Sequence, residues 1–506
     1  MKTRMIQISR NGSLIRKQKE RTNRKVLIPI PIKKKPKTTL EIIGGNAEDV
    51  TGSATLITCN KKQSLFEFGM IQRGKTPYEN YQMNKELLSS VRPSKIQNIF
   101  VGHCHCDHIG MIPALYKKGC SATIYVPKGS YLILQEMWKD SAYINCRDAE
   151  IMSAQREKPI LPLFTEDDVT LALQYIREID FHELYQVDDD ISIRFSYAGH
   201  ILFSAQTELF ISENNHFKKI LFTSDLGNLK LNKPFVESFE PVSSTNIVIG
   251  EATYASPKRT VTDKDYKTDL VKIKTVIHQY CQETRGNVLI PCFALDRLPY
   301  MLWILHNIFA KEEFHVPVVV DSPLGIRLLQ SYQKVLPEEM QEPFRKMLSW
   351  ENLKFTAEPS ESKAAMADPT PKIILASSGM LTAGRSVKWT QKILPQAESC
   401  ILFIGYAASN TLGYKIKNGL SAKTITINGK ECQNNANIVD LHSFSSHMQR
   451  DDLLDYYSSI RAEKIYLVHS NMDDRLVFKV DLEKKLADQC QSTRVIAVNK
   501  GMKISI

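Results

Sequence analysis

The stretch His103-Cys104-His105-Cys106-Asp107-His108 contains four metal-binding His and Asp side chains within six residues. An apolar run at residues 96–101 precedes it and predicts a buried β-strand. In an extended segment, side chains two positions apart share a face, so His103 and His105 point the same way. Asp107 and His108 follow at the predicted start of a helix. This layout can hold two metal ions side by side.

A structural zinc site is one alternative, because cysteine and histidine together are its usual ligands. Such sites normally pair their cysteines with two to four residues between them, and none of the ten cysteines has that spacing. We therefore expect Cys104 and Cys106 to face the protein interior. A cluster of histidines without any metal is the other alternative.

Strands elsewhere in the chain end in residues of the same kind. Apolar strands are predicted at residues 191–197, 219–223, 247–250 and 465–469. The residues at their C-terminal ends are His200, Asp225, Glu251 and His469. Sites of layered α/β proteins lie at the carboxyl ends of strands, so these side chains are expected to join the first motif.

Glu67 is an acidic residue inside the apolar strand at residues 65–69. A buried carboxylate without a partner is costly. We therefore expect Glu67 to be hydrogen-bonded or close to a metal. The alternative is a strand residue held by an ordinary salt bridge.

The length of 506 residues is large for one core and predicts two or three domains. The pattern predicts a tail at 1–39, a first domain that begins at 40–255, regular α/β alternation at 256–398, and a return to the first domain at 399–506. Turns of the alternating block contain Ser322, Ser378 and Arg385, which suit contact with phosphate. Ordinary loop chemistry explains these three residues equally well.

The positive charge is concentrated at the N-terminus. The first 40 residues contain thirteen Lys or Arg and one acid, Glu20, so they carry +12 and the rest of the chain carries −1. Such a run is typical of a solvated, disordered arm. It can also hold RNA, a ribosome or another polyanion without reading its sequence.

Nothing in the sequence predicts a membrane protein. No apolar run approaches the roughly 17 residues that a membrane span needs, and no signal peptide is predicted. The cysteines are scattered without a disulfide framework, which favours a reducing cytoplasm.

The whole set of motifs resembles the β-CASP nuclease family of the metallo-β-lactamase fold, from about Leu40 to Ile506. The resemblance also rests on local strings typical of its bacterial and archaeal ribonuclease branch: residues 48–53, 290–294, 321–324, 376–381 and 411–413. It implies an α/β fold, a metallo-β-lactamase αββα sandwich with an inserted β-CASP domain.

The resemblance implies a role for each motif residue. His103, His105 and His200 would hold one zinc ion, and Asp107, His108 and His469 the other, with Asp225 bridging; manganese could substitute for zinc. His447 would be the general acid, oriented by Glu251. Asp107 and Glu67 are further catalytic candidates. A histidine at His469, where relatives acting on DNA tend to carry valine, favours RNA.

We therefore expect a two-zinc ribonuclease, with endonucleolytic cleavage and a metal-activated hydroxide; the sequence does not determine the oligomeric state and leaves a homodimer open. A catalytically weak RNA-binding scaffold subunit is the alternative, and a hydrolase of small phosphodiesters or esters is a third. Three residues depart from the family pattern: Glu67 replaces an aspartate, and Asp296 and Ser470 replace glycines. These departures put substrate contacts in doubt more than metal binding.

Overall fold

The computed structural model describes residues 38–156, 158–213, 216–258 and 261–506. Within the first 37 residues it describes only three short antiparallel strands, β1 (Ile6–Ile8), β2 (Leu14–Lys19) and β3 (Lys25–Pro29). The rest of the basic tail lies outside the described residues, so its disorder stays a prediction.

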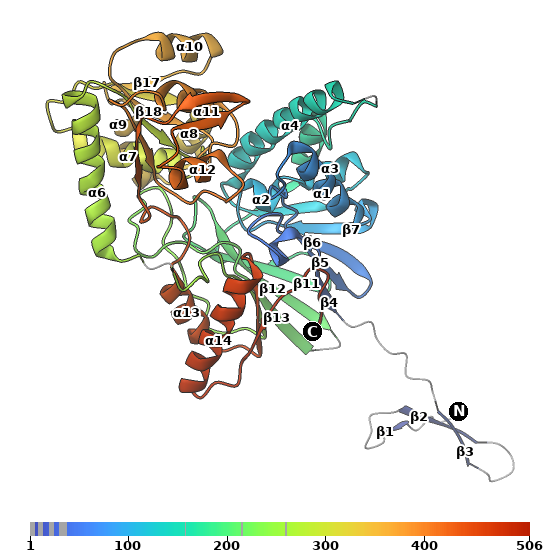
Figure 1. Ribbon diagram of the computed structural model, residues 1–506. Coiled ribbons are helices and arrows are strands. Elements are labelled where there is room, and N and C mark those ends of the chain that lie inside the picture. The colour runs from blue at the N-terminus through green and yellow to red at the C-terminus, as the bar shows by residue number, and fades with distance from the viewer. Residues whose placement is uncertain are drawn as a thin grey trace.

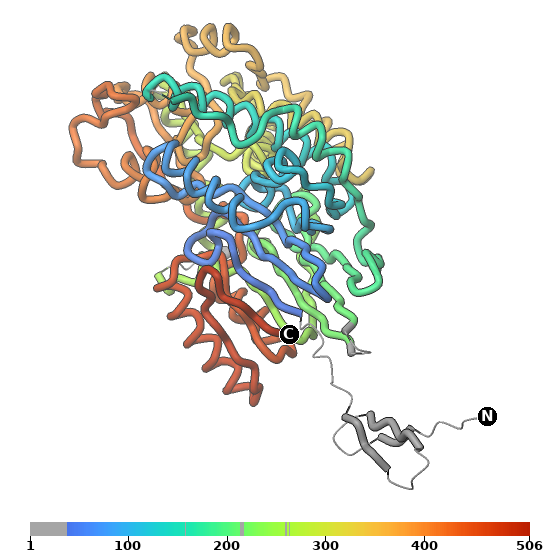
Figure 2. The backbone as a smooth tube through the Cα atoms, turned by 90° about the vertical axis from the view of Figure 1, so that its right-hand side faces the viewer, coloured from blue at the N-terminus to red at the C-terminus, as the bar shows by residue number. Residues whose placement is uncertain are grey.

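Two seven-stranded sheets form the first domain (Figure 1). The first contains, in spatial order, β25 (Lys503–Ser505), β4 (Thr39–Ile42), β5 (Thr55–Cys59), β6 (Lys62–Phe66), β7 (Ile96–Phe100), β8 (Thr123–Pro127) and β9 (Ile176–Ile179). The second contains β10 (Tyr185–Gln186), β11 (Ile191–Tyr197), β12 (Ala205–Glu213), β13 (His216–Phe222), β14 (Ile247–Glu251), β23 (Lys464–Val468) and β24 (Arg494–Ala497). The last strand, β25, pairs with β4, so the C-terminus lies beside the first strands of this domain (Figure 2).

The two sheets pack face to face through an apolar core. The stacked rings of Phe66 and Phe222, one from each sheet, have centroids 4.1 Å apart. The helices on the outer face of the first sheet are α1 (Pro77–Ser89), α3 (Ile112–Lys117), α4 (Ser130–Ala154) and α5 (Glu166–Leu173). Helices α13 (Arg450–Ser459) and α14 (Met472–Asp488) cover the second sheet. The predicted αββα sandwich is confirmed.

The inserted domain has a six-stranded parallel sheet. Its strands, in spatial order, are β17 (Leu353–Phe355), β16 (Val318–Asp321), β18 (Ile373–Ala376), β15 (Val288–Pro291), β19 (Cys400–Phe403) and β22 (Asn437–Asp440). Its helices are α6 (Asp263–Ile277), α7 (Arg297–Phe309), α8 (Pro323–Val335), α9 (Glu338–Leu348), α10 (Pro359–Ala367), α11 (Arg385–Ile393) and α12 (Leu412–Asn418). A hairpin of β20 (Thr424–Ile427) and β21 (Lys430–Gln433) precedes β22.

One predicted boundary is wrong. We expected the chain to return to the first domain at residue 399, but β19 pairs with β15 and β22 pairs with β19, so both belong to the inserted sheet. The inserted domain therefore extends to about residue 440. The apolar pattern of β19 shows that the strand is buried on both faces, but it cannot show which sheet the strand joins.

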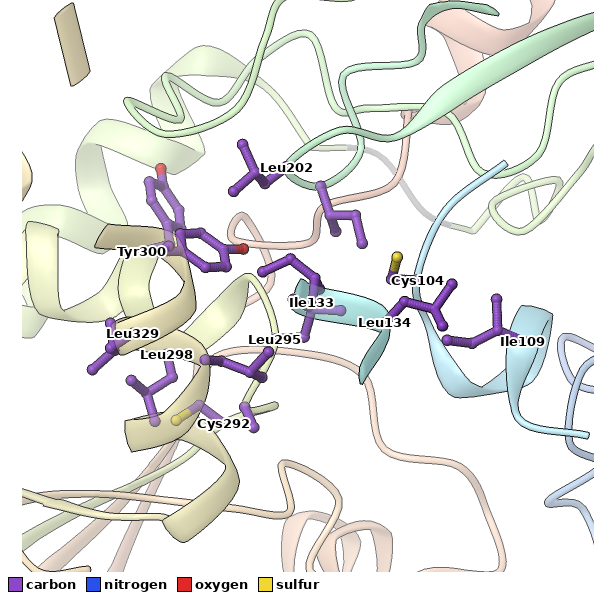
Figure 3. Close-up of a cluster of buried hydrophobic side chains, with 14 of the residues drawn as sticks. Cys104, Ile109, Ile133, Leu134, Leu202, Cys292, Leu295, Leu298, Tyr300 and Leu329 are labelled. Carbon is purple, nitrogen blue, oxygen red and sulfur yellow. The ribbon is translucent and has the colours of Figure 1, made fainter. Parts of the chain in front are cut away.

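A shared apolar core joins the two domains. Figure 3 shows Ile133 and Leu134 of α4 between Cys104 of the first domain and Leu295 and Leu298 of the inserted domain. Helix α4 is thus buried on both sides and packs the inserted domain against the first domain. Within the described ranges, none of the helices combines the length and the apolar character needed to cross a membrane.

Candidate metal centre

The candidate metal centre lies where strands of the two sandwich sheets end. The motif of residues 103–108 follows β7, and its last residues form the short helix α2 (Cys106–Ile109). His200, Asp225, Glu251 and His469 come from the ends of β11, β13, β14 and β23. His447 lies on the segment that returns from the inserted domain and forms a β-bridge with Gly227. All the strand-end residues predicted to meet therefore do so.

Three imidazoles and one carboxylate form the first cluster. Nδ1 of His105 lies 3.1 Å from Nε2 of His103 and 3.2 Å from Nε2 of His200. Oδ2 of Asp225 lies 3.5 Å from the His103 nitrogen and 3.6 Å from the His200 nitrogen. A tetrahedral zinc ion with ligand distances of about 2.0–2.1 Å would separate its ligand atoms by about 3.3–3.4 Å. The spacing of this cluster fits such an ion.

The second cluster consists of Asp107, His108 and His469. Oδ2 of Asp107 lies 3.7 Å from Nε2 of His108 and 3.5 Å from Nε2 of His469. Oδ2 of Asp225 lies 3.4 Å from Nε2 of His108, so the same oxygen borders both clusters. Nε2 of His108, Nε2 of His469 and Oδ1 of Asp225 are buried and lack a hydrogen-bond partner among the described residues. Such unsatisfied buried atoms fit a site built to hold a cation.

Buried histidines suit metal binding only when their coordinating nitrogen is unprotonated. Burial lowers the pKa of His103 and His200 well below its usual value and that of His105 to about 4. Burial also lowers the pKa of His108, but the carboxylates of Glu67, Asp225 and Asp107 outweigh it and raise that pKa. The three histidines of the first cluster are therefore neutral and ready to ligate, whereas those of the second cluster must release protons when a cation binds.

Glu67 lies behind the ligands, not in front of them. Its Oε2 is 2.6 Å from Nδ1 of His108 and accepts a hydrogen bond from the hydroxyl of Ser53 at 2.6 Å. Its Oε1 accepts from the hydroxyl of Ser224 at 2.7 Å and from the Gly102 amide at 3.3 Å. The residue is fully buried. The expectation that Glu67 is hydrogen-bonded is confirmed. Its candidate catalytic role is corrected, because both of its carboxylate oxygens are already engaged by these buried neighbours.

Glu251 and His447 form a pair at the edge of the clusters. Backbone amides of Leu226 and Thr253 donate to the two Glu251 oxygens at 3.0 and 2.8 Å. Oε1 of Glu251 then lies 3.5 Å from Nδ1 of His447. The His447 side chain is 21% exposed, whereas Glu251 is buried. The carboxylate can thus orient the imidazole while the ring remains open to a substrate.

Three supporting residues were not predicted from the sequence. Ser53 and Ser224 donate to Glu67, and Ser224 also lies 2.9 Å from Nδ1 of His103. The hydroxyl of Thr253 lies 2.9 Å from Nδ1 of His469. Each residue is next to, or within a few positions of, a recognised motif. No spacing rule, however, predicts hydrogen bonds between segments this far apart in the chain.

The predicted phosphate contacts of the inserted domain are only partly available. The guanidinium of Arg385 donates to Asp321 and to the carbonyl groups of Thr356 and Ala357. Ser322 is buried, caps α8 and contacts Ser377. The polar groups of both residues are therefore used inside the inserted domain, so we correct their assignment to substrate contacts. Ser378 is half-buried and bonds to its own loop, and its contact with substrate stays a prediction.

The cysteines of the central motif face away from the clusters, as predicted. Cys104 is buried, with Sγ 3.9 Å from the carbonyl oxygen of Ser130. Sγ of Cys106 lies 3.6 Å from the hydroxyl of Ser141. Neither thiol belongs to a metal-competent group among the described residues. The arrangement therefore argues against a structural cysteine–zinc site.

Two protein families match segments of this chain. Residues 300–416 match the Beta-Casp domain, and residues 433–491 match the Zn-dependent metallo-hydrolase RNA specificity domain. The chain therefore contains these two domains and is distantly homologous to β-CASP proteins of the metallo-β-lactamase fold. The second match identifies this β-CASP protein as a metallo-hydrolase, in agreement with its buried His and Asp clusters.

Relatives of this β-CASP protein extend over most of the chain. Ribonuclease TTHA0252 of Thermus thermophilus is 26% identical over 470 residues, covering 91% of this chain and 99% of that protein. Transcription termination factor FttA of Methanocaldococcus jannaschii is 27% identical, covering 75% of this chain and 59% of that protein. A crystal structure of a protein of unknown function from Enterococcus faecalis V583 covers 93% of this chain and 100% of that chain, with 15% identity and a TM-score of 0.51. This last similarity concerns the fold alone.

Proposed function

We propose that this β-CASP protein is a zinc-dependent ribonuclease that hydrolyses RNA phosphodiester bonds by endonucleolytic cleavage. The observation that carries the proposal is that one oxygen of Asp225 borders two metal-competent clusters beside the Glu251–His447 pair. RNA as the substrate class is supported by the match to an RNA specificity domain and by the relative named a ribonuclease. A cytoplasmic location stays a prediction.

The proposed metal ligands divide into two sets that share one residue. His103, His105 and His200 would hold one zinc ion, Asp107, His108 and His469 the second, and Asp225 would contact both. When bound, two such ions activate water and neutralise charge on a phosphate. Asp107 is the ligand with the most exposed carboxylate, at 23%, so it lies at the open side of the site.

His447 is the proposed general acid. Its Nδ1 faces Glu251, so Nε2 is the atom that would donate a proton to the departing ribose oxygen. Glu251 accepts the Nδ1–H bond and fixes the ring, while the two backbone amides fix Glu251 itself. This division of roles leaves His447 free to act without being a metal ligand.

The test compares the wild-type protein with His447→Ala, both loaded with zinc. We expect the wild type to cut internally labelled RNA into fragments of several lengths, and 5′-labelled RNA to yield labelled products longer than one nucleotide. His447→Ala should retain its zinc and lose cleavage by roughly 10²- to 10⁴-fold. Cleavage by His447→Ala at the wild-type rate would refute the assigned role.

Metal content separates this proposal from the scaffold alternative. A scaffold that only keeps the fold has no need for a complete ligand set, and fewer than two zinc ions per chain would favour it. Competition of RNA against small chromogenic diesters separates the ribonuclease from a hydrolase of small substrates. Preference for the small diester would contradict the RNA assignment.

A further inference from the structure

A buried charged cluster lies at the boundary between the two domains, outside the proposed ligand set. Lys233 belongs to the segment between β13 and β14 of the first domain, and Asp296 directly precedes α7 of the inserted domain. Their side chains are 5% and 4% exposed. Ser446, which directly precedes His447, is buried beside them. The cluster therefore joins both domains to the segment that carries the proposed general acid.

The contacts of this cluster form a closed circuit with His200. The Lys233 ammonium donates to the backbone carbonyl of His200 and lies 3.8 Å from Oδ1 of Asp296. Oδ2 of Asp296 accepts a hydrogen bond from the hydroxyl of Ser446. The carbonyl of Ser446 lies 3.3 Å from Nδ1 of His200 and accepts its N–H. A hydrogen bond at Nδ1 leaves Nε2 of His200 for a metal.

Arg297 extends the circuit to the segment before His447. Its guanidinium donates to the carbonyl oxygens of Ile404 and Phe444 and to the Ser446 hydroxyl at 3.3 Å. The His447 ring follows directly and lies with its centroid 4.5 Å from that of His200. The Ser446 backbone therefore contacts the His200 ring and directly precedes the His447 ring.

Burying such a cluster is costly. Two opposite charges removed from water rarely stabilise a fold more than apolar residues would. The backbone of Asp296 has a φ of +64°, a conformation that is unfavourable for a residue with a side chain. Costs of this kind are commonly retained where a functional geometry depends on them.

We propose that Lys233, Asp296 and Ser446 are positioning residues that fix the ring of His200 and the place of His447 through the boundary between the domains. This inference rests on the proposed function for the role of His447. The positioning of His200 does not depend on which substrate is cut.

A second ion pair across the same boundary provides a matched control. Arg327 of α8 contacts Glu136 and Asp140 of α4 at 2.7 and 3.3 Å. None of these residues contacts the metal-competent clusters in the described part of the chain. Loss of this pair removes a link between the domains but leaves the circuit around His200 intact.

The experiment compares Lys233→Met, Asp296→Asn and Ser446→Ala with Arg327→Met. Three quantities are measured for each variant. Competition with a chromogenic chelator gives the zinc affinity, and labelled RNA gives the single-turnover cleavage rate. RNA affinity is measured in a separate binding experiment. We expect the first three variants to lose zinc affinity and single-turnover rate by roughly 10- to 100-fold while RNA affinity stays unchanged. Lys233→Met combined with Asp296→Asn should be no worse than either alone, because the two charges act as one unit.

Arg327→Met should match the wild type in all three measurements. The inference is overturned if the first three variants keep wild-type zinc affinity and rate, or if Arg327→Met loses as much as they do. If Lys233→Met fails to fold, Ser446→Ala still tests the inference, because this substitution removes only a single hydroxyl group. If the wild type binds zinc but cuts no RNA, the proposed function fails and the zinc measurement still tests the positioning of His200.

Discussion

The carboxylate of Glu67 lies 2.6 Å from Nδ1 of His108, and the hydroxyl of Ser224 connects its other oxygen to Nδ1 of His103. One carboxylate thus orients a histidine of each metal-competent cluster. Hydrogen bonds at both Nδ1 atoms make Nε2 the nitrogen that each ring offers to a cation, and His108 releases its Nε2 proton when the cation binds. Glu67, which departs from the family pattern, therefore supports the metal-binding histidines.

Glu67→Gln should weaken zinc binding by roughly 10- to 100-fold. Both Glu67 oxygens accept hydrogen bonds, and an amide would place an NH₂ group against one set of donors. Zinc affinity measured by chelator competition checks this. Glu41→Gln, on the partly exposed Glu41 that contacts Lys503, is the matched control and should not change the affinity. Equal zinc affinity in the wild type, Glu67→Gln and Glu41→Gln would refute the role of Glu67.

Asp225→Asn should lower the zinc content below two ions per chain. Its Oδ2 lies within 3.6 Å of imidazole nitrogens in both clusters, and an asparagine oxygen carries no charge to share between two cations. Elemental analysis by plasma mass spectrometry of the dialysed protein measures this. Retention of two tightly bound zinc ions would show that Asp225 does not bridge them.

Glu251→Gln should slow RNA cleavage by about 10²-fold with zinc content unchanged. The variant keeps the size of the side chain, but its amide cannot accept hydrogen bonds from the amides of Leu226 and Thr253 and from His447 at the same time. Single-turnover rates and metal analysis of one preparation separate the two effects. A loss of zinc in parallel with the rate would instead make Glu251 part of the metal site.

Cys104 and Cys106 should resist alkylation in the folded protein at pH 8. Burial raises the pKa of both thiols to about 12, so almost no reactive thiolate forms. The exposed Cys490 should be labelled at the same pH. Peptide mapping after labelling measures the three sites. If a zinc chelator made Cys104 and Cys106 reactive while the fold stayed intact, the structural cysteine–zinc alternative would return.

Deletion of residues 1–37 should weaken RNA binding and its dependence on salt. The deleted segment carries a net charge of +12, and each phosphate contact contributes about 0.7–0.9 to the slope of log affinity against log salt. The deletion stops before Thr38, whose carbonyl accepts a hydrogen bond from Ile506. Binding measured at several salt concentrations checks this, and an unchanged slope would leave the tail without a role in RNA tethering.

The sequence alone predicted the fold class and the motif residues that the structure brings together. Local spacing explains the motif residues, because a strand followed by closely placed ligands predicts its own geometry. The sandwich fold was implied by the resemblance to the β-CASP family. The apolar runs before His200, Asp225 and His469 likewise predicted that these residues lie at strand ends, and all of them join the site.

Tertiary structure alone decided what surrounds those residues. The sequence identified Glu67 as unusual, but only the packing of residues 53 and 224 against it shows that it supports the ligands instead of facing the substrate. The boundary at residue 399 and the assignments of Ser322 and Arg385 failed for the same reason. Strand pairing and hydrogen bonding between distant segments depend on how elements meet in space, and the periodicity of a single segment carries no information about its partner.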